Sequence, residues 1–114
     1  MNSIYTAEDD VKKVKETINR FYSAYYQGDL LALYDCMDSY FQRRVHFKYF
    51  LIHERYQQNL GVLLEITAVE INTAHKAAAA EILLKYMGRD IRKSIALYKE
   101  PGGWRLEGDI FPEL

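Results

Sequence analysis

The chain has 114 residues, a length typical of one domain that buries its own core without metal or disulfide staples. Its fifteen basic and sixteen acidic side chains are scattered and give a net charge of −1. We therefore expect neither nucleic acid nor a membrane surface as a partner, because both need clustered basic residues. With a single cysteine, no signal peptide and no apolar span, a cytoplasmic protein is the default expectation.

Two amphipathic helices are predicted at the start of the chain. Apolar residues recur at three- and four-residue steps from Val11 to Tyr25, behind acidic residues at 8–10 that suit a helix amino end. Gly28 is placed to end this helix, and Asp29 to cap a second helix over about 30–38. Because only Gly-Asp joins them, the two helices must fold back or bend sharply against one another.

The next segment is predicted to hold a turn and a third helix. Residues 39–44 are interpreted as an irregular turn that carries Tyr40 and Phe41 inward. From Val45 to Leu60, apolar residues again step by three or four, which predicts a helix over about 44–60 that Gly61 ends.

Four strands are predicted after Gly61, over 62–73, 75–87, 91–100 and 104–111. The gaps between them are too short for crossover helices, so neighbouring strands must be antiparallel. Apolar residues occupy even positions up to Ala68 and odd positions from Val69, which predicts a β-bulge near Ala68. The predicted fold class is α+β, with three helices packed on a curved antiparallel sheet of four strands in a single domain over 1–114.

The second and third strands carry apolar residues on both faces. Ile82 and Leu84 share one face of the second strand, while Leu83 and Met87 share the other. Three helices cover only one face of a sheet, and the other face of an antiparallel sheet is normally polar. The remaining apolar face therefore predicts a partner, most simply a second copy of the chain in a twofold homodimer.

The stretches INRFYSAYYQGDLLALYDCMDSYF at 18–41 and GGWRLEGDIF at 102–111 carry a family resemblance. The order of elements is a helix, Gly-Asp, a second helix, a short third helix and then a curved antiparallel sheet, and it resembles the NTF2-like (SnoaL-like, cystatin-type α+β) superfamily. The resemblance implies a cone closed by the helices, a pocket at its open end and dimerisation through the sheet. Members of similar outline include ketosteroid isomerase, dehydratases, polyketide cyclases, nuclear transport adaptors and domains with no known activity.

One position tests the resemblance to the isomerases. Their oxyanion-binding tyrosine lies seven residues before the Gly-Asp pair, where this chain has Phe21. A phenyl ring cannot donate that hydrogen bond, so isomerase chemistry of this kind is not expected. The adjacent Tyr22 is turned by about 100° around the helix, and is therefore no simple substitute.

Ten tyrosines are the strongest departure from average composition. A tyrosine ring is apolar along its face and polar at its tip, which suits a small-molecule cavity or an interface. The alternative is that the rings fill a thin core while their hydroxyls reach solvent. The candidate ligand-binding residues are Tyr25, Tyr34, Tyr49, His53, Tyr56, Glu65 and Trp104.

No metal ion or cofactor is expected. His46 and His53 would lie about 10 Å apart along a regular helix, too far to share one ion. The sequence has no HExxH or CxxC motif, and no P-loop, GxGxxG or GxSxG motif. Cys36 has no evident activating base beside it and is expected to be a small buried apolar residue.

Three functions of different classes are compatible with this pattern. The preferred one is a non-catalytic NTF2-like module that dimerises through its sheet and holds a small apolar or aromatic ligand in the cone. The second is an isomerase, dehydratase or cyclase that uses Glu65 or Asp38 with Tyr25 or His53. The third is a protein-interaction module that binds a partner through its tyrosine-rich helices.

Overall fold

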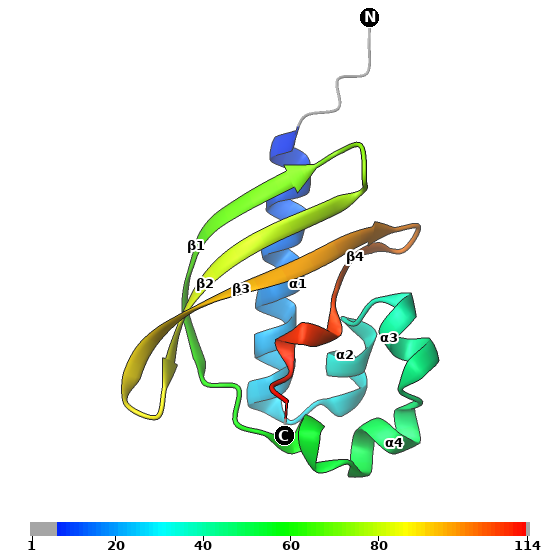
Figure 1. Cartoon of the computed structure of the whole chain (residues 1–114), viewed down its shortest axis with the longest axis vertical. Helices are drawn as coiled ribbons and strands as arrows, with labels where there is room; N and C mark the ends of the chain where they lie inside the picture. The colour runs from blue at the N-terminus through cyan, green and yellow to red at the C-terminus, as the bar shows by residue number, and fades with distance from the viewer. Residues whose placement is uncertain (1–6, 114) are drawn as a thin grey trace, which may run out of the picture.

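The computed structural model describes residues 7–113 (Figure 1). Within this range the helical part consists of α1 (Ala7–Gln27), α2 (Leu30–Asp35), α3 (Ser39–Arg44), α4 (Phe47–Ile52) and the 3₁₀ turn η1 (Glu54–Gln57). It is followed by β1 (Val62–Asn72), β2 (Ala77–Tyr86), β3 (Arg89–Glu100), β4 (Gly103–Leu106) and the 3₁₀ turn η2 (Gly108–Ile110). The strands form one open antiparallel sheet in the order β1-β2-β3-β4, so the predicted α+β class is confirmed.

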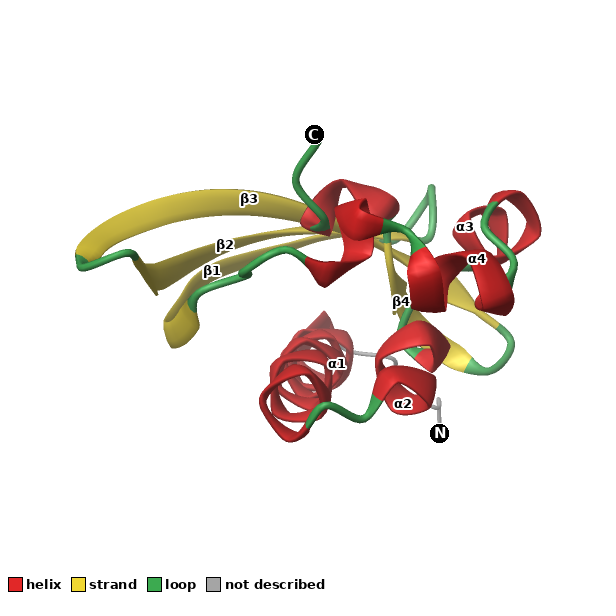
Figure 2. Ribbon diagram, turned by 90° about the horizontal axis from the view of Figure 1, so that it is seen from below, coloured by secondary structure: helices red, strands yellow, loops and turns green. Residues whose placement is uncertain are grey.

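Helix α1 packs under the curved sheet (Figure 2). Its apolar face is fully buried at Val14, Ile18 and Phe21, as the helical spacing predicts. Gly28 ends the helix with a left-handed φ of +69°. Asp29 then begins α2, because its side chain accepts the amide of Ala32 at 3.1 Å. The sharp junction predicted at Gly-Asp is therefore confirmed.

The segment 39–60 differs from the prediction. Residues 39–44 form helix α3 instead of an irregular turn, because the Asp38 side chain accepts the amide of Phe41 at 2.7 Å and caps the helix. Phe41 is buried as predicted, but Tyr40 is 59% exposed. The predicted helix over 44–60 is broken into α4 and η1 at His53, whose backbone is extended and whose Nδ1 accepts the amide of Arg55.

Strand β1 contains two bulges. The register shifts between Ile66 and Ala68, as predicted, and also between Leu63 and Glu65, which was not predicted. Each bulge adds one residue to β1, so inward-facing residues occur at steps of three, three and two at Leu63, Ile66, Val69 and Ile71. The second bulge explains why Val62 and Leu64, expected on the same face as Ile66, are about half exposed (50% and 47%).

The last strand is shorter than predicted, ending at Leu106 instead of residue 111. Leu106 is held against the segment after α2, since its amide donates to the carbonyl of Cys36 at 2.7 Å and its carbonyl accepts the amide of Asp38 at 2.8 Å. The chain then turns through η2 and directs Phe111 into the core.

Five aromatic rings fill the centre of the space between the helices and the sheet. We call Phe21, Phe41, Phe50, Tyr56 and Phe111 the aromatic cluster. Phe111 contacts each of the other four rings, with centroid separations between 5.2 and 5.8 Å. All five residues are 8% exposed or less. The ring of Tyr56 is therefore part of the core, as the second of the two accounts of the tyrosines predicted.

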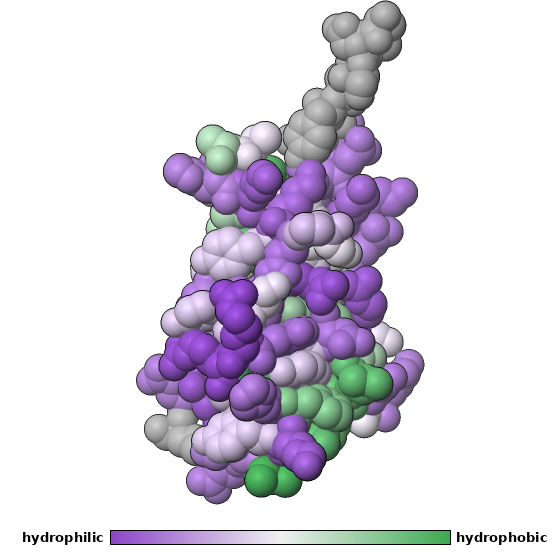
Figure 3. All heavy atoms as spheres, turned by 90° about the vertical axis from the view of Figure 1, so that its right-hand side faces the viewer, coloured by the Kyte–Doolittle hydropathy of each residue, from purple (hydrophilic) through white to green (hydrophobic). Residues whose placement is uncertain are grey.

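Exposed apolar side chains gather at the end of the molecule that holds α2 and α4 (Figure 3). Leu31 of α2 is 58% exposed and Ile52 of α4 is 80% exposed. Tyr49 of α4 is also exposed, so this end combines aliphatic and aromatic surface.

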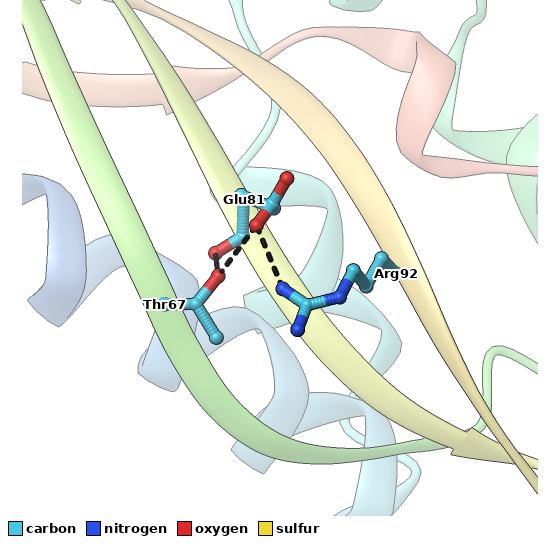
Figure 4. Close-up of polar contacts among 3 residues, drawn as sticks. All are labelled: Thr67, Glu81 and Arg92. Atoms are coloured by element: carbon cyan, nitrogen blue, oxygen red, sulfur yellow. Dashed lines mark hydrogen bonds and ion pairs between the residues drawn. The ribbon is translucent and has the colours of Figure 1, made fainter.

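The outer face of the sheet, which no helix covers, mixes polar and small apolar residues. A polar row crosses three strands, where Glu81 Oε1 accepts Thr67 Oγ1 and Arg92 Nη1, each at 3.0 Å (Figure 4). Next to this row, Ala79 of β2 pairs with Ala96 of β3. The face is therefore less apolar than the strand pattern alone suggested.

Two glycines with left-handed backbones provide a matched stability test. At Gly61, with φ of +79°, an added Cβ would lie 2.8 Å from the backbone oxygen of Lys85, whereas at Gly28 it would meet nothing within 4 Å. Gly28→Ala is expected to lower the free energy of unfolding by about 1 kcal/mol for the left-handed backbone alone. Gly61→Ala should lower it by at least about 1 kcal/mol more, through the added clash. Urea unfolding measures both, and equal losses would show that the close approach at Gly61 is absent.

Candidate functional site

A cavity of about 260 Å³ lies beside the aromatic cluster, between α1 and the ends of β2 and β3. The β2–β3 hairpin extends beyond the helices, so the inner face of these strand ends is only partly covered (Figures 1 and 2). The wall is mostly apolar and is formed by Tyr22, Asn59, Leu60, Leu84, Tyr86, Ile91, Lys93, Ile110 and Pro112.

Lys93 is the charged side chain of this wall. It shares the inward face of β3 with Ile91 and Ile95 and pairs with the buried Ile82 of β2. Its Nζ donates to the carbonyl of Ile110 at 3.1 Å, and within residues 7–113 no carboxylate lies at ion-pair distance from it. Burial lowers the pKa of the Lys93 ammonium, and Asp109 opposes this effect. The cavity therefore contains a cation whose observed partner is a neutral oxygen.

Tyr22 brings a second polar group to the same cavity. The residue is 2% exposed, and its ring meets Phe21 edge to face at 5.3 Å. Burial raises the pKa of the Tyr22 hydroxyl, and Tyr26 and Tyr25 raise it further. The Tyr22 hydroxyl therefore stays protonated at neutral pH and can donate a hydrogen bond.

The sequence analysis did not select Lys93, Tyr22 or this cavity. A signal for Lys93 was present, because a lysine on the apolar face of a predicted strand has to be explained. Tyr22 could not be placed from the sequence alone, since the direction of its ring depends on the exact rotation of α1 against the sheet.

Three of the predicted ligand-binding tyrosines hold the fold together. The Tyr25 hydroxyl accepts the amide of Leu60 at 2.9 Å and lies 3.3 Å from the Asn59 side-chain oxygen. The Tyr34 hydroxyl lies 2.6 Å from the carbonyl of Val45, which ties α2 to the end of α3. Tyr56 is a member of the aromatic cluster.

Of the other four predicted residues, Tyr49 and His53 contact each other and Tyr56, whereas Glu65 and Trp104 lie elsewhere. Tyr49 stacks on His53 with a centroid distance of 4.7 Å, and the Tyr49 ring is half exposed on α4. Glu65 is exposed on the edge strand β1. Trp104 is buried in β4, and it lines a different cavity from the one that Tyr56 lines. The structure therefore does not bring the predicted set together at one site, and its role in binding a ligand remains a prediction.

Asp38, one of the two carboxylates of the enzymatic alternative, lines a cavity with titratable residues other than the predicted Tyr25 and His53. Asp38 is 4% exposed and lines an open cavity of about 550 Å³ together with Tyr98, Glu100 and Glu107. Burial raises the pKa of the Asp38 carboxyl, and Glu100 acts in the same direction. The Tyr98 hydroxyl donates to Glu107 Oε2 at 3.1 Å, and burial followed by this hydrogen bond raises its pKa.

No set of metal ligands is assembled in the part of the chain that the structure describes. Within residues 7–113, three His, Cys, Asp or Glu side chains nowhere lie close enough to hold an ion. Cys36 is fully buried, as predicted. Burial raises the pKa of its thiol, against the lowering effect of Arg20.

No family model, curated protein or solved structure matches the chain. Among the described residues, none of the helices is both long and apolar enough to cross a bilayer.

Cys36 gives a direct probe of this core. We expect its thiol in the native protein to react with iodoacetamide at least about a hundredfold more slowly at pH 8 than in urea, because burial blocks access and disfavours the thiolate. Mass spectrometry of timed samples measures both rates. A native rate equal to that of the unfolded chain would contradict the burial of Cys36 at the end of α2.

Proposed function

We propose that this chain is a non-catalytic NTF2-like module that binds one small apolar or aromatic ligand and dimerises through the outer face of its sheet. The ligand site is the cavity between Tyr22 and Lys93. The single observation that carries the proposal is the inward-facing Lys93, a cation in a mostly apolar cavity whose observed partner is the carbonyl of Ile110.

The wall of the cavity indicates the chemistry of the ligand. Apolar side chains from α1, β2, β3 and the C-terminal segment favour a hydrocarbon or aromatic body. Lys93 Nζ and the Tyr22 hydroxyl can both donate hydrogen bonds to a ligand, and a carboxylate is the group that gains most from a partly desolvated ammonium. The volume is just below the range of roughly 300–1,000 Å³ typical of drug-sized ligands. A short aliphatic or aromatic acid of the size of hexanoate or benzoate therefore fits best.

The absence of catalysis is proposed on two grounds. Phe21 occupies the position of the isomerase tyrosine, and it packs against Phe111 with a centroid separation of 5.8 Å. The aromatic cluster fills the centre of the enclosed space, so a substrate would have no room beside Phe21. A ligand held at the side of the cluster meets donors, but no carboxylate among the residues that line the cavity.

Dimerisation is proposed through the alanine-rich part of the outer face. Ala68 and Ala79 are exposed there, and Tyr98 is 39% exposed on the neighbouring strand. Small side chains let a second sheet approach closely, while Glu81 and Arg92 next to them offer a charge pair that a twofold axis can place opposite its copy.

The ligand site is tested by titrating hexanoate and benzoate into the ¹⁵N-labelled protein. We expect saturable shifts at residues around the cavity, and Lys93→Met should weaken binding about tenfold or more, because a charge-assisted hydrogen bond is lost. Lys85→Met is the matched control, since Lys85 lies on the same hairpin but pairs with Asp90 at the surface.

Two results would overturn this site. One is a wild-type spectrum that neither acid changes. The other is an equal loss of affinity in the Lys93 and Lys85 variants, which would assign the effect to overall charge.

The proposed dimer is tested by placing a charge on the outer face. Ala79→Glu should convert the dimer to a monomer in sedimentation velocity while the circular dichroism spectrum is preserved, because the interface would bury an unpaired carboxylate. Ser23→Glu, at an exposed position of α1, makes the same change of charge and should leave the dimer intact. A wild-type monomer at every concentration measured would contradict the proposal.

A second candidate function is enzymatic and rests on the cavity beside Asp38. Two titratable groups with raised pKa, Asp38 and Tyr98, line the same cavity as Glu107, an arrangement enriched at catalytic sites. Asp38 would then act as an acid that keeps its proton to higher pH than an exposed aspartate.

The protein-interaction alternative rests on Leu31 and Ile52, the exposed aliphatic surface of α2 and α4.

A further inference from the structure

A second cavity, of about 180 Å³, lies against Phe41 and Tyr56, two rings of the aromatic cluster. It is bordered by the end of α3, by η1 and by the segment that follows β4 (Figure 1). None of its lining residues lines the Lys93 cavity, so the two sites are distinct. We call this space the arginine cavity, because Arg44 and Arg55 both line it.

The floor of the arginine cavity is apolar and tightly packed. Phe41 and Tyr56 are 7% and 8% exposed, and their rings meet edge to face at 5.7 Å. Gly108 lies directly against Phe41, because a Cβ added to Gly108 would be 2.8 Å from Phe41 Cδ2. This contact holds the segment that carries Glu107 and Asp109 against the floor.

Two arginines bring positive charge to the cavity. The exposed Arg44 guanidinium lies over the Tyr40 ring at 5.3 Å, and the partly buried Arg55 guanidinium lies over the Tyr56 ring at 5.9 Å. Within residues 7–113 neither guanidinium lies at ion-pair distance from a carboxylate. In Arg55 only Nε is buried without a hydrogen-bond partner, so Nη1 and Nη2 remain accessible to a ligand.

Two carboxylates border the same cavity from a different segment. Glu107 Oε2 accepts the Tyr98 hydroxyl at 3.1 Å, and Asp109 is exposed. Neither carboxylate forms an ion pair with another residue of the described chain. The cavity therefore has cations from α3 and η1 and carboxylates from residues 107–109, with no ion pair between them.

This arrangement indicates a ligand that carries both signs of charge. The carboxylates would repel an anion, and the arginines would repel a cation. A zwitterion satisfies both pairs, since its carboxylate can accept from a guanidinium fork and its ammonium can donate to Glu107 or Asp109. The cavity is smaller than the roughly 300–1,000 Å³ typical of drug-sized ligands, so the zwitterion has to be small.

We propose that the arginine cavity binds a free α-amino acid with an apolar side chain. Its carboxylate lies at Arg44 and Arg55, and its ammonium lies at Asp109 and Glu107. Its side chain lies on the apolar floor beside Phe41 and Tyr56, the second of which the sequence had marked as a ligand-binding residue. This site is independent of the acid-binding cavity at Lys93.

Three probes with the same aliphatic body separate the charges. The ¹⁵N-labelled protein is titrated near pH 6.5 with L-leucine, with L-leucinamide, which lacks the carboxylate, and with N-acetyl-L-leucine, which lacks the ammonium. We expect leucine to give saturable shifts at the amides of Gly108 and Asp109. Each of the other two probes should bind there about tenfold or more weakly, because each loses a charge-assisted contact.

Two variants assign the two ends of the ligand. Arg55→Gln should abolish the preference for leucine over leucinamide, and Asp109→Asn should abolish the preference for leucine over N-acetyl-leucine. Lys48→Gln and Glu54→Gln, at exposed positions that do not line the cavity, make the same changes of charge and should bind leucine as the wild type does. If Arg55→Gln does not fold, Arg44→Gln at the exposed end of α3 replaces it.

Three results would overturn the proposal. The first is the absence of saturable leucine shifts at Gly108 and Asp109, including the case in which leucine shifts only residues around Lys93. The second is equal affinity of the wild type for all three probes, which would show a site that reads only the aliphatic body. The third is a loss of leucine affinity in the two control variants as large as that in the two site variants.

Discussion

The packing of Phe111 against four other aromatic rings is the contact on which the rest of this structure depends. Phe111 lies after the end of the last strand, and it meets rings from α1, α3, α4 and η1. Three of these elements are only four to six residues long and are too short to be stable in isolation. The aromatic cluster therefore holds the short helices in place and joins them to α1 and to the segment after β4. It also fills the centre of the enclosed space, and the cavities described above lie around it.

Much of the fold was predictable because it rests on local patterns. The apolar period of α1, the Gly-Asp junction and the bulge at Ala68 all follow from residue spacing. The errors have local physical causes that spacing does not reveal. Asp38 accepts the amide of Phe41 and begins helix α3 where a turn was predicted, and His53 accepts the amide of Arg55 and interrupts the predicted long helix. The C-terminal end of β4 depends on hydrogen bonds of Leu106 with the distant Cys36 and Asp38, so no local signal set it.

The candidate sites were predictable only in part, because a site depends on which side chains point into the same space. Tyr25 and Tyr34 are residues of a type that often lines binding sites, yet their hydroxyls form hydrogen bonds with the backbone of neighbouring segments. The more informative residues are the charged ones on inward faces. Lys93 and Lys99 lie on the same face of β3 at opposite ends of the apolar core, and each borders a cavity. The two bulges and the exposed Glu65 and Glu70 of β1 are features that disfavour pairing of this edge strand with another strand.

The most direct measurement of this account is the urea unfolding of Phe111→Ala, with and without benzene. If Phe111 joins the short helices to the sheet, the variant should lose about 3–5 kcal/mol of unfolding free energy, as large core truncations do. The new cavity should be dry and apolar, so benzene should restore part of the loss in the variant and have no effect on the wild type. A loss below about 1 kcal/mol, typical of surface substitutions, with no response to benzene, would contradict the central role of the aromatic cluster.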